Sequence, residues 1–347
     1  MKKHLRLFTS LFLVLCILVS LTAVFAAESD SESEYPQYNT YTCLGDSIAA
    51  GFGYFANHNG LTSLGCEQVD IAYHSIVADA VGADLNPLGY SFMSCYDLMT
   101  LLDSNYSSLN AYIATSKTFL NNNGGKFSNL ASARSYYQNS VKDSDLITVN
   151  VGSNDLWSYP ILESLGAVSA YVSASSIIDI YNEITSKNYD MNAMLSTYLD
   201  FVTSIDQLSI GVTALIKNMT TAYFNYLQNI NTVINDIKAI NSNATIVLVG
   251  LYNPSSELQL TDAEIIPIGR FYDGVVAMTN LYLRMCASLN GCVFAGVMGT
   301  DLIDSPSLLE TFTTISGVAK FVIGFHPSEA GHKQMADSIL EALKSNA

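Results

Sequence analysis

Near position 40 the chain reads Tyr41-Thr42-Cys43-Leu44-Gly45-Asp46-Ser47, and this segment carries the strongest signal of its fold. The first four residues form an apolar run typical of a buried strand, and the Gly-Asp-Ser triplet ends that strand in a turn. Small residues at 49–51 then open the next element. Ser47 therefore stands where a strand ends, and we expect its hydroxyl to point into a cleft at the edge of a sheet.

Four more apolar runs with strand character follow along the 347-residue chain, at 85–90, 146–151, 244–251 and 292–297. Helical patterns lie between them. The clearest pattern has apolar residues at alternating four- and three-residue steps over 223–237, and a last helix begins near Ser328, a suitable N-cap. Strands that alternate with helices predict an α/β protein with a mainly parallel five-stranded sheet covered on both faces. Its reactive groups should gather at the carboxyl ends of the strands.

The N-terminus resembles a secretory signal peptide. Basic residues precede an almost wholly apolar run at 11–25, and small residues follow up to Ala26. An uncleaved membrane anchor is the alternative, because this run approaches the ~20 residues that span a bilayer. The polar tail that follows favours cleavage and export from the cell. The expected organisation is a signal peptide at 1–26, an acidic serine-rich linker at 27–40 and one domain at 41–347.

Charge and cysteine content exclude several classes of partner. The net charge is −16, and loss of Lys2, Lys3 and Arg6 with the leader changes it to −19. Such a surface repels nucleic acids and anionic membranes, so we expect neither a nucleic-acid partner nor stable membrane insertion after processing. Five cysteines remain without the CxxC spacing of a zinc site, and we expect Cys43 and Cys95 to be small buried hydrophobes.

The segment at about 158–232 is too long for a simple crossover between strands. Its helix-compatible stretches are rich in Tyr, Asn, Ser and Thr. Two interpretations remain open: an inserted helical cap that borders the substrate cleft, or a helix pair that only covers the protein from solvent.

Two residues far from Ser47 can act with it. Asn154 follows the run at 146–151, and its amide can donate a hydrogen bond to an oxyanion, although an Asx-turn is the alternative. His326 precedes a proline, which holds it extended, and histidine has the pKa suited to a base near neutral pH. Together the three residues supply a nucleophile, an oxyanion donor and a base, the minimum equipment for acyl transfer.

Other polar residues near these segments receive structural interpretations. We expect Asp155 to cap a helix and His332 to be exposed on the last helix. His58 and His74 have no motif around them.

These segments resemble the blocks of the GDSL or SGNH hydrolase family, over nearly all of the mature chain. The similar segments are Gly45-Asp46-Ser47, Gly152-Ser153-Asn154-Asp155, His326-Pro327 with Gly331, and Leu248 to Pro254. The resemblance implies a three-layer α/β/α sandwich with Ser47 as nucleophile and no metal or organic cofactor. It also implies an oxyanion hole made by the Ser47 N–H, an N–H of the second block and the Asn154 side chain.

The sequence departs from the family pattern in two places. In the second block the expected glycine is displaced, so that Gly89 or Ser91 would supply the oxyanion N–H. In the fifth block Ile323 stands three residues before the histidine, where the family has an aspartate. Asp301 or Asp304 would then orient the histidine, or a main-chain carbonyl would accept its proton in a Ser-His dyad.

We therefore expect a secreted serine ester hydrolase, either a GDSL-type esterase or lipase or a carbohydrate O-deacetylase. It would act through an acyl-serine intermediate on a small-molecule or polysaccharide ester. The alternative is a catalytically weakened or inactive protein of the same fold that binds a glycan or peptide outside the cell, with aromatic rings stacked on sugars. The sequence does not distinguish between acyl lipids and acetylated polysaccharides.

Overall fold

The computed structural model describes residues 34–54, 64–114, 119–120, 125–160, 205–254, 268–303 and 324–347. These residues belong, from Tyr35 onward, to one compact unit that ends at Ala347. Residues 1–33 lie outside the described part, so the signal peptide and its cleavage stay a prediction. Most of the predicted cap, 161–204, also lies outside it.

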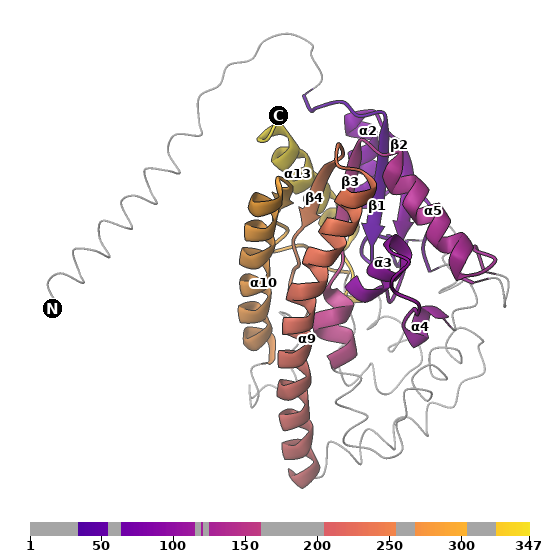
Figure 1. Cartoon of the computed structure of the whole chain (residues 1–347). Coiled ribbons are helices and arrows are strands. Elements are labelled where there is room, and N and C mark those ends of the chain that lie inside the picture. The colour runs from indigo at the N-terminus through magenta and orange to yellow at the C-terminus, as the bar shows by residue number, and fades with distance from the viewer. Residues whose placement is uncertain are drawn as a thin grey trace, which may run out of the picture. The chain divides into compact units, whose positions relative to one another are not determined.

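Five parallel strands form one sheet in the order β2-β1-β3-β4-β5 (Figure 1). The strands are β1 (Thr40–Gly45), β2 (Asp84–Gly89), β3 (Leu146–Asn150), β4 (Thr245–Val249) and β5 (Val293–Ala295). All five apolar runs of the sequence therefore form strands, as predicted. Every residue of β3 is buried, because helices cover both faces of the sheet.

The helices pack as two outer layers, which confirms the three-layer α/β/α sandwich. One face carries α3 (Cys95–Leu102), α5 (Leu130–Lys142), α9 (Ile205–Ile240) and α10 (Ile268–Asn290). The other face carries α2 (Tyr73–Val81) and α13 (Glu329–Lys344). Two short elements lie in the connections: α4 (Ala111–Ala114) and the π-helix η2 (Asn154–Ser158).

Helix α13 begins as predicted, because the Ser328 side chain accepts a hydrogen bond from the Gly331 N–H (3.0 Å) and so caps its N-terminus. The expectation that His332 is exposed was wrong, since this residue is fully buried. His332 lies three and seven residues before Met335 and Ile339, and this helical spacing places all three on the face that packs against the sheet.

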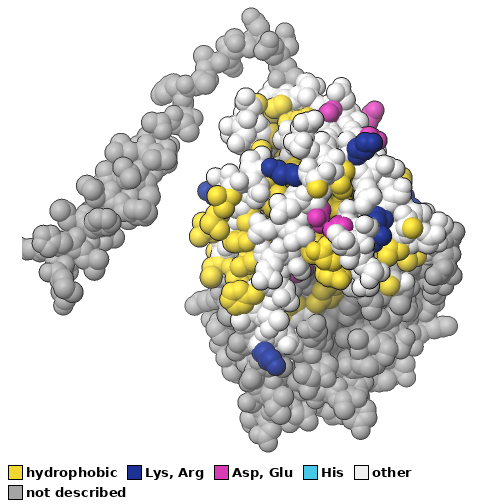
Figure 2. Space-filling model, viewed as in Figure 1, with side chains coloured by type: hydrophobic (Ala, Val, Ile, Leu, Met, Phe, Trp, Pro, Cys, Tyr) yellow, Lys and Arg dark blue, Asp and Glu magenta, His cyan; other side chains and the backbone are white. Residues whose placement is uncertain are grey.

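Helix α9 is continuous for 36 residues, so position 232, the predicted end of the cap, falls inside it. The helix therefore also forms the crossover that returns the chain to β4. On α10 the outer face is apolar, and Figure 2 shows hydrophobic side chains gathered on the side where α10 lies in Figure 1. The exposed large side chains of this helix are Met278, Leu281, Met285 and Leu289.

The strand order makes the connections after β1 and β3 diverge. From β1 the chain moves to β2 on one side, whereas from β3 it moves to β4 on the other. Loops that diverge in this way leave a ligand site at the carboxyl ends of the two strands. The strands approach closely there: Gly45 pairs with Asn150, and a Cβ on Gly45 would lie 2.0 Å from the Asn150 carbonyl oxygen. Only glycine fits this position, which also has a φ of +156°.

Three further observations concern the class of protein. Among the described helices none is both long and apolar enough to cross a membrane. The five cysteines after position 26 are free thiols, and Cys43 and Cys95 are buried as predicted. Within the described ranges no group of three His, Cys, Asp or Glu side chains is placed to hold a metal ion.

Candidate active site

Ser47 and His326, 279 residues apart, meet at the carboxyl end of the sheet. The Ser47 Oγ lies 2.9 Å from the His326 Nε2, within hydrogen-bond distance. Both side chains are half-buried and so remain in contact with solvent. Ser47 stands in a tight turn directly after β1, in which the Phe52 N–H donates to the Ser47 carbonyl (3.0 Å). A serine hydroxyl that faces an imidazole nitrogen has the geometry of a nucleophile with its general base.

Asp46 shapes the turn that presents Ser47. Its carboxylate is buried, and Oδ1 accepts a hydrogen bond from the Ile48 N–H (3.0 Å). Burial raises the pKa of Asp46 to about 7, while the backbone of Ile48 and the nearby Ser153 act to lower it. Asp46 is therefore a structural residue that links the loop after β1 to the loop after β3.

Asn154 occupies the first position of η2, in the loop after β3. Its side chain is buried, and Nδ2 donates a hydrogen bond to the Met93 carbonyl (3.0 Å). An amide nitrogen carries two hydrogens, so one is used to fix the orientation of the group and the second is available to an oxyanion. The sheet brings this loop beside Ser47, because β3 pairs directly with β1.

The backbone N–H groups around the site differ in whether they already donate a hydrogen bond within the protein. Among the described residues, no group accepts a hydrogen bond from the Ser47 N–H. The Ser91 N–H, by contrast, donates to the Leu64 carbonyl (2.7 Å). Gly89 serves close packing, because a Cβ there would lie 2.5 Å from the backbone of Ala49. Within the described residues, the Ser47 N–H is thus available to a ligand, whereas the Ser91 N–H already donates a hydrogen bond. Gly89 has a packing role. A second-block oxyanion donor stays a prediction.

The turn after β2 contains a residue in an unusual backbone conformation. Phe92 adopts a φ of +67°, in the left-handed region that side chains other than glycine rarely enter. Its carbonyl is held by the Asn110 Nδ2 (3.2 Å) and by the Tyr159 hydroxyl. These bonds stabilise the strained turn, whose next residue, Met93, orients Asn154.

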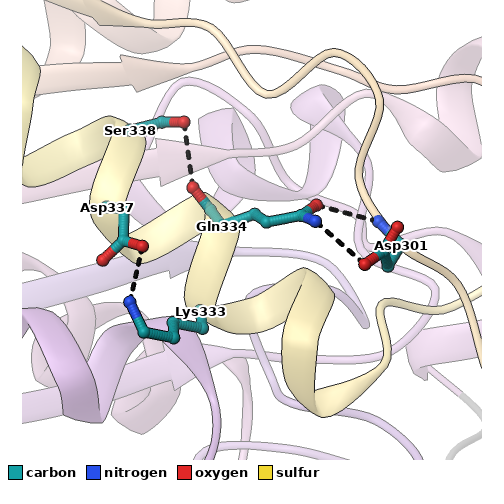
Figure 3. Close-up of polar contacts among 5 residues, drawn as sticks. All are labelled: Asp301, Lys333, Gln334, Asp337 and Ser338. Carbon is teal, nitrogen blue, oxygen red and sulfur yellow. Dashed lines mark hydrogen bonds and ion pairs between the residues drawn. The ribbon is translucent and has the colours of Figure 1, made fainter.

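Asp301 lies in the loop after β5 and forms hydrogen bonds with the N-terminal half of α13. Its Oδ2 accepts a hydrogen bond from the Gln334 Nε2 (2.9 Å), and its N–H donates to the Gln334 Oε1 (3.0 Å), as Figure 3 shows. The same loop also holds the histidine segment, because the Ile303 N–H donates to the His326 carbonyl (3.0 Å). The Asp301 carboxylate thus has a structural partner.

Asp304 and Ile323 lie outside the described residues. The identity of the group that orients His326 therefore stays a prediction.

His74, which no sequence motif marked, lies on α2 and supports the turn that carries Ser47. This side chain is fully buried; its Nδ1–H donates to the Ala49 carbonyl (2.9 Å), and its Nε2 accepts from the Val69 N–H (3.2 Å). Burial lowers the pKa of His74 to about 4, so the ring is neutral at pH 7. Its spacing from Val77 and Val81 on one helix face was the signal that could have shown its burial.

Other side chains support the site from behind. The Phe52 ring packs on the His326 ring, with centroids 4.6 Å apart. Burial, together with the nearby His74 and His326, lowers the pKa of His332 to about 3, so His332 is not a base at neutral pH. Asp155 has a structural role, as predicted. The helix that it caps is α3, where its carboxylate accepts a hydrogen bond from the Cys95 N–H (3.1 Å).

Comparison with known proteins finds one matching family and several similar solved structures. The model of the family described as GDSL-like Lipase/Acylhydrolase matches residues 41–339, which include Ser47, Asn154 and His326. The chain is similar to an extracellular lipase from Streptomyces rimosus, with 14% identity, 89% of this chain and 100% of that chain covered, and a TM-score of 0.48.

Two further solved structures are similar at comparable levels. One is phospholipase A1 from Streptomyces albidoflavus NA297, with 15% identity, 89% and 100% coverage, and a TM-score of 0.44. The other is a carbohydrate esterase family 2 enzyme with a carbohydrate-binding domain from Corynascus thermopiles, with 14% identity, 93% and 69% coverage, and a TM-score of 0.42. No curated protein matches the sequence.

Proposed function

Because the chain belongs to the family of GDSL-like lipases and acylhydrolases, and is thereby a carboxylic ester hydrolase, we propose that it is a secreted serine hydrolase that works through an acyl-serine intermediate. The observation that carries the proposal is the 2.9 Å contact between the Ser47 Oγ and the His326 Nε2. The leader-like N-terminus supports secretion.

The first half-reaction follows from the positions of these groups. The His326 Nε2 takes the proton of the Ser47 hydroxyl while Oγ attacks the ester carbonyl carbon. Negative charge then develops on the former carbonyl oxygen, to which the Ser47 N–H and the second N–H of the Asn154 amide donate hydrogen bonds. The tetrahedral intermediate collapses when His326 gives its proton to the leaving alcohol, and the acyl group remains on Ser47.

The second half-reaction uses the same groups in reverse. His326 accepts a proton from water, the resulting hydroxide equivalent attacks the acyl carbon, and the oxyanion donors again hold the negative charge. Collapse returns the proton to the Ser47 Oγ and releases the carboxylic acid. Each step balances without a further reactant, since water supplies both the nucleophile and the proton.

Preorganisation explains why the surrounding polar groups matter. The Asn154 amide is already oriented by the Met93 carbonyl, so little reorientation is needed when the oxyanion forms. The loop after Ser47 is fixed in the same way by the Ile48 N–H bond to Asp46 and by the His74 bond to Ala49. Groups that are rigid before reaction stabilise the transition state without a further ordering cost.

Hydrolysis of p-nitrophenyl butyrate by the purified mature chain tests the proposal. We expect Ser47→Ala to lower kcat by at least about 10³-fold, because the acyl-enzyme cannot form. Ser75→Ala is the matched control, since it removes another buried serine hydroxyl, on α2, from a residue outside the candidate site. A wild-type chain that cleaves no ester, or a Ser47→Ala variant as active as the wild type, would overturn the proposal.

A further inference from the structure

Three aromatic rings from separate parts of the chain gather beside the candidate catalytic residues. We call this cluster the aromatic wall: Trp157 on η2, Tyr272 in α10 and Phe325 directly before His326. The Trp157 ring centroid lies 4.1 Å from that of Tyr272 and 5.9 Å from that of Phe325, both in edge-to-face geometry. Trp157 and Phe325 are half-buried, whereas Tyr272 is buried.

The aromatic wall is connected to both sides of the reacting centre. Trp157 follows Asn154 by three residues within the same short helix, and Phe325 is the neighbour of His326 in the chain. In the proposed mechanism Asn154 holds the oxyanion and His326 serves the nucleophile and the leaving group. A ring packed between the elements that carry these two residues is placed to contact a substituent of the ester.

The chemistry of the aromatic wall favours an apolar, uncharged substituent. The Tyr272 hydroxyl reaches the Leu156 carbonyl (3.5 Å), and a further hydroxyl beside the wall, that of Tyr252, donates to the Phe325 carbonyl (2.8 Å). With these hydroxyls directed to the backbone, the wall offers ring surface. A sugar needs several hydrogen-bond partners for its hydroxyls, whereas an alkyl chain needs none and gains roughly fourfold in binding for each methylene it buries.

We propose that Trp157 contacts the substrate and that the aromatic wall binds the acyl chain of a neutral ester of medium chain length. This inference rests on the proposed function, because it assumes that Asn154 and His326 flank the reacting carbonyl. It assigns to Trp157 a role in substrate specificity, separate from the chemical steps at Ser47.

Trp157 is the only tryptophan of the chain, so intrinsic tryptophan fluorescence reports on this position alone. The experiment titrates the Ser47→Ala chain, which holds esters without turning them over, with ethyl hexanoate and in parallel with acetylated xylotriose. We expect a saturable blue shift of the emission with ethyl hexanoate and no saturable change with the acetylated sugar. Emission that stays constant with ethyl hexanoate, or that responds only to the sugar, contradicts the proposal.

Kinetics of Trp157→Ala distinguish a role in binding from a merely structural one. We expect kcat/KM to fall about tenfold for p-nitrophenyl octanoate and less than about twofold for the acetate, as for the loss of contact with one or two methylenes. Trp157→Phe should restore most of the octanoate activity. The matched control is Tyr136→Ala, which removes an exposed ring from α5.

An equal loss on both esters would show a structural role and would overturn the proposal. Should Trp157→Ala fail to fold, the fluorescence titration still decides the question. A wild-type chain without any esterase activity would refute the proposed function, whereas the titration would then still show whether the aromatic wall binds an alkyl chain.

Discussion

Replacing His74 by glutamine should change how the stability of the protein depends on pH. The folded protein holds this imidazole neutral between the Ala49 carbonyl and the Val69 N–H, with a pKa of about 4 instead of the ordinary 6.5. Between these pH values the unfolded chain binds a proton at His74 that the folded chain does not bind. The folded state therefore loses stability as the pH falls from 6.5 towards 4.

The size of this effect follows from the pKa difference. Each unit corresponds to about 1.4 kcal/mol, so His74 removes about 3 kcal/mol over the whole range and about 2 kcal/mol by pH 5. Glutamine does not titrate. We expect His74→Gln to be less stable than the wild type by about 1–3 kcal/mol at pH 7.5, because glutamine cannot satisfy both backbone partners. At pH 5 this difference in stability should be smaller by about 2 kcal/mol.

Urea unfolding followed by circular dichroism measures the difference in free energy of unfolding between the wild type and His74→Gln, at pH 7.5 and at pH 5. Titration of the buried groups that His74 does not influence, Asp46 among them, is common to both proteins and cancels in the comparison. Tyr73→Phe is the matched control, since it removes a buried hydroxyl from the same helix and no group that titrates in this range. Wild-type and His74→Gln stabilities that fall in parallel would refute the neutral, buried state of His74.

Three further predictions concern the site and the core. Asn154→Ala should lower kcat by about 10²–10³-fold with little change in KM, and a kcat near that of the wild type would remove Asn154 from the oxyanion hole. Asp301→Asn should keep kcat within about threefold in ester hydrolysis, because its carboxylate serves Gln334; a large loss there, with none in Asp304→Asn, would reverse this assignment. Leu283→Ala (1% exposed) should lower the free energy of unfolding by about 3 kcal/mol and Leu281→Ala (70% exposed) by less than about 0.5 kcal/mol, and equal losses in urea unfolding would contradict the packing of α10.

The sheet could be predicted from the sequence because its central strands, β1, β3 and β4, are buried on both faces. The run at 146–151 is then mostly apolar, and the turn residues that follow it mark where it ends. The start of α13 could also be predicted from the sequence, since Ser328 is a serine N-cap before an amphipathic pattern. Local chemistry decides both features, so no knowledge of distant contacts was needed.

The support of the site depends on contacts that no spacing encodes. His74 and His332 are buried because α2 and α13 pack against the same face of the sheet, and their hydrogen bonds to backbone groups become visible only in three dimensions. The engagement of Asp301 by Gln334 is likewise a contact between a loop and a helix 33 residues away. Histidine and aspartate have several structural uses, so residue type alone could not separate a catalytic role from a supporting one.

Labelling with a fluorophosphonate probe, followed by peptide mass spectrometry, tests most directly whether Ser47 is an activated nucleophile. We expect a single covalent adduct on Ser47, absent from Ser47→Ala and formed far more slowly in His326→Gln, because the base that takes the serine proton is missing. An adduct on another residue, or labelling at an unchanged rate without His326, would contradict this expectation.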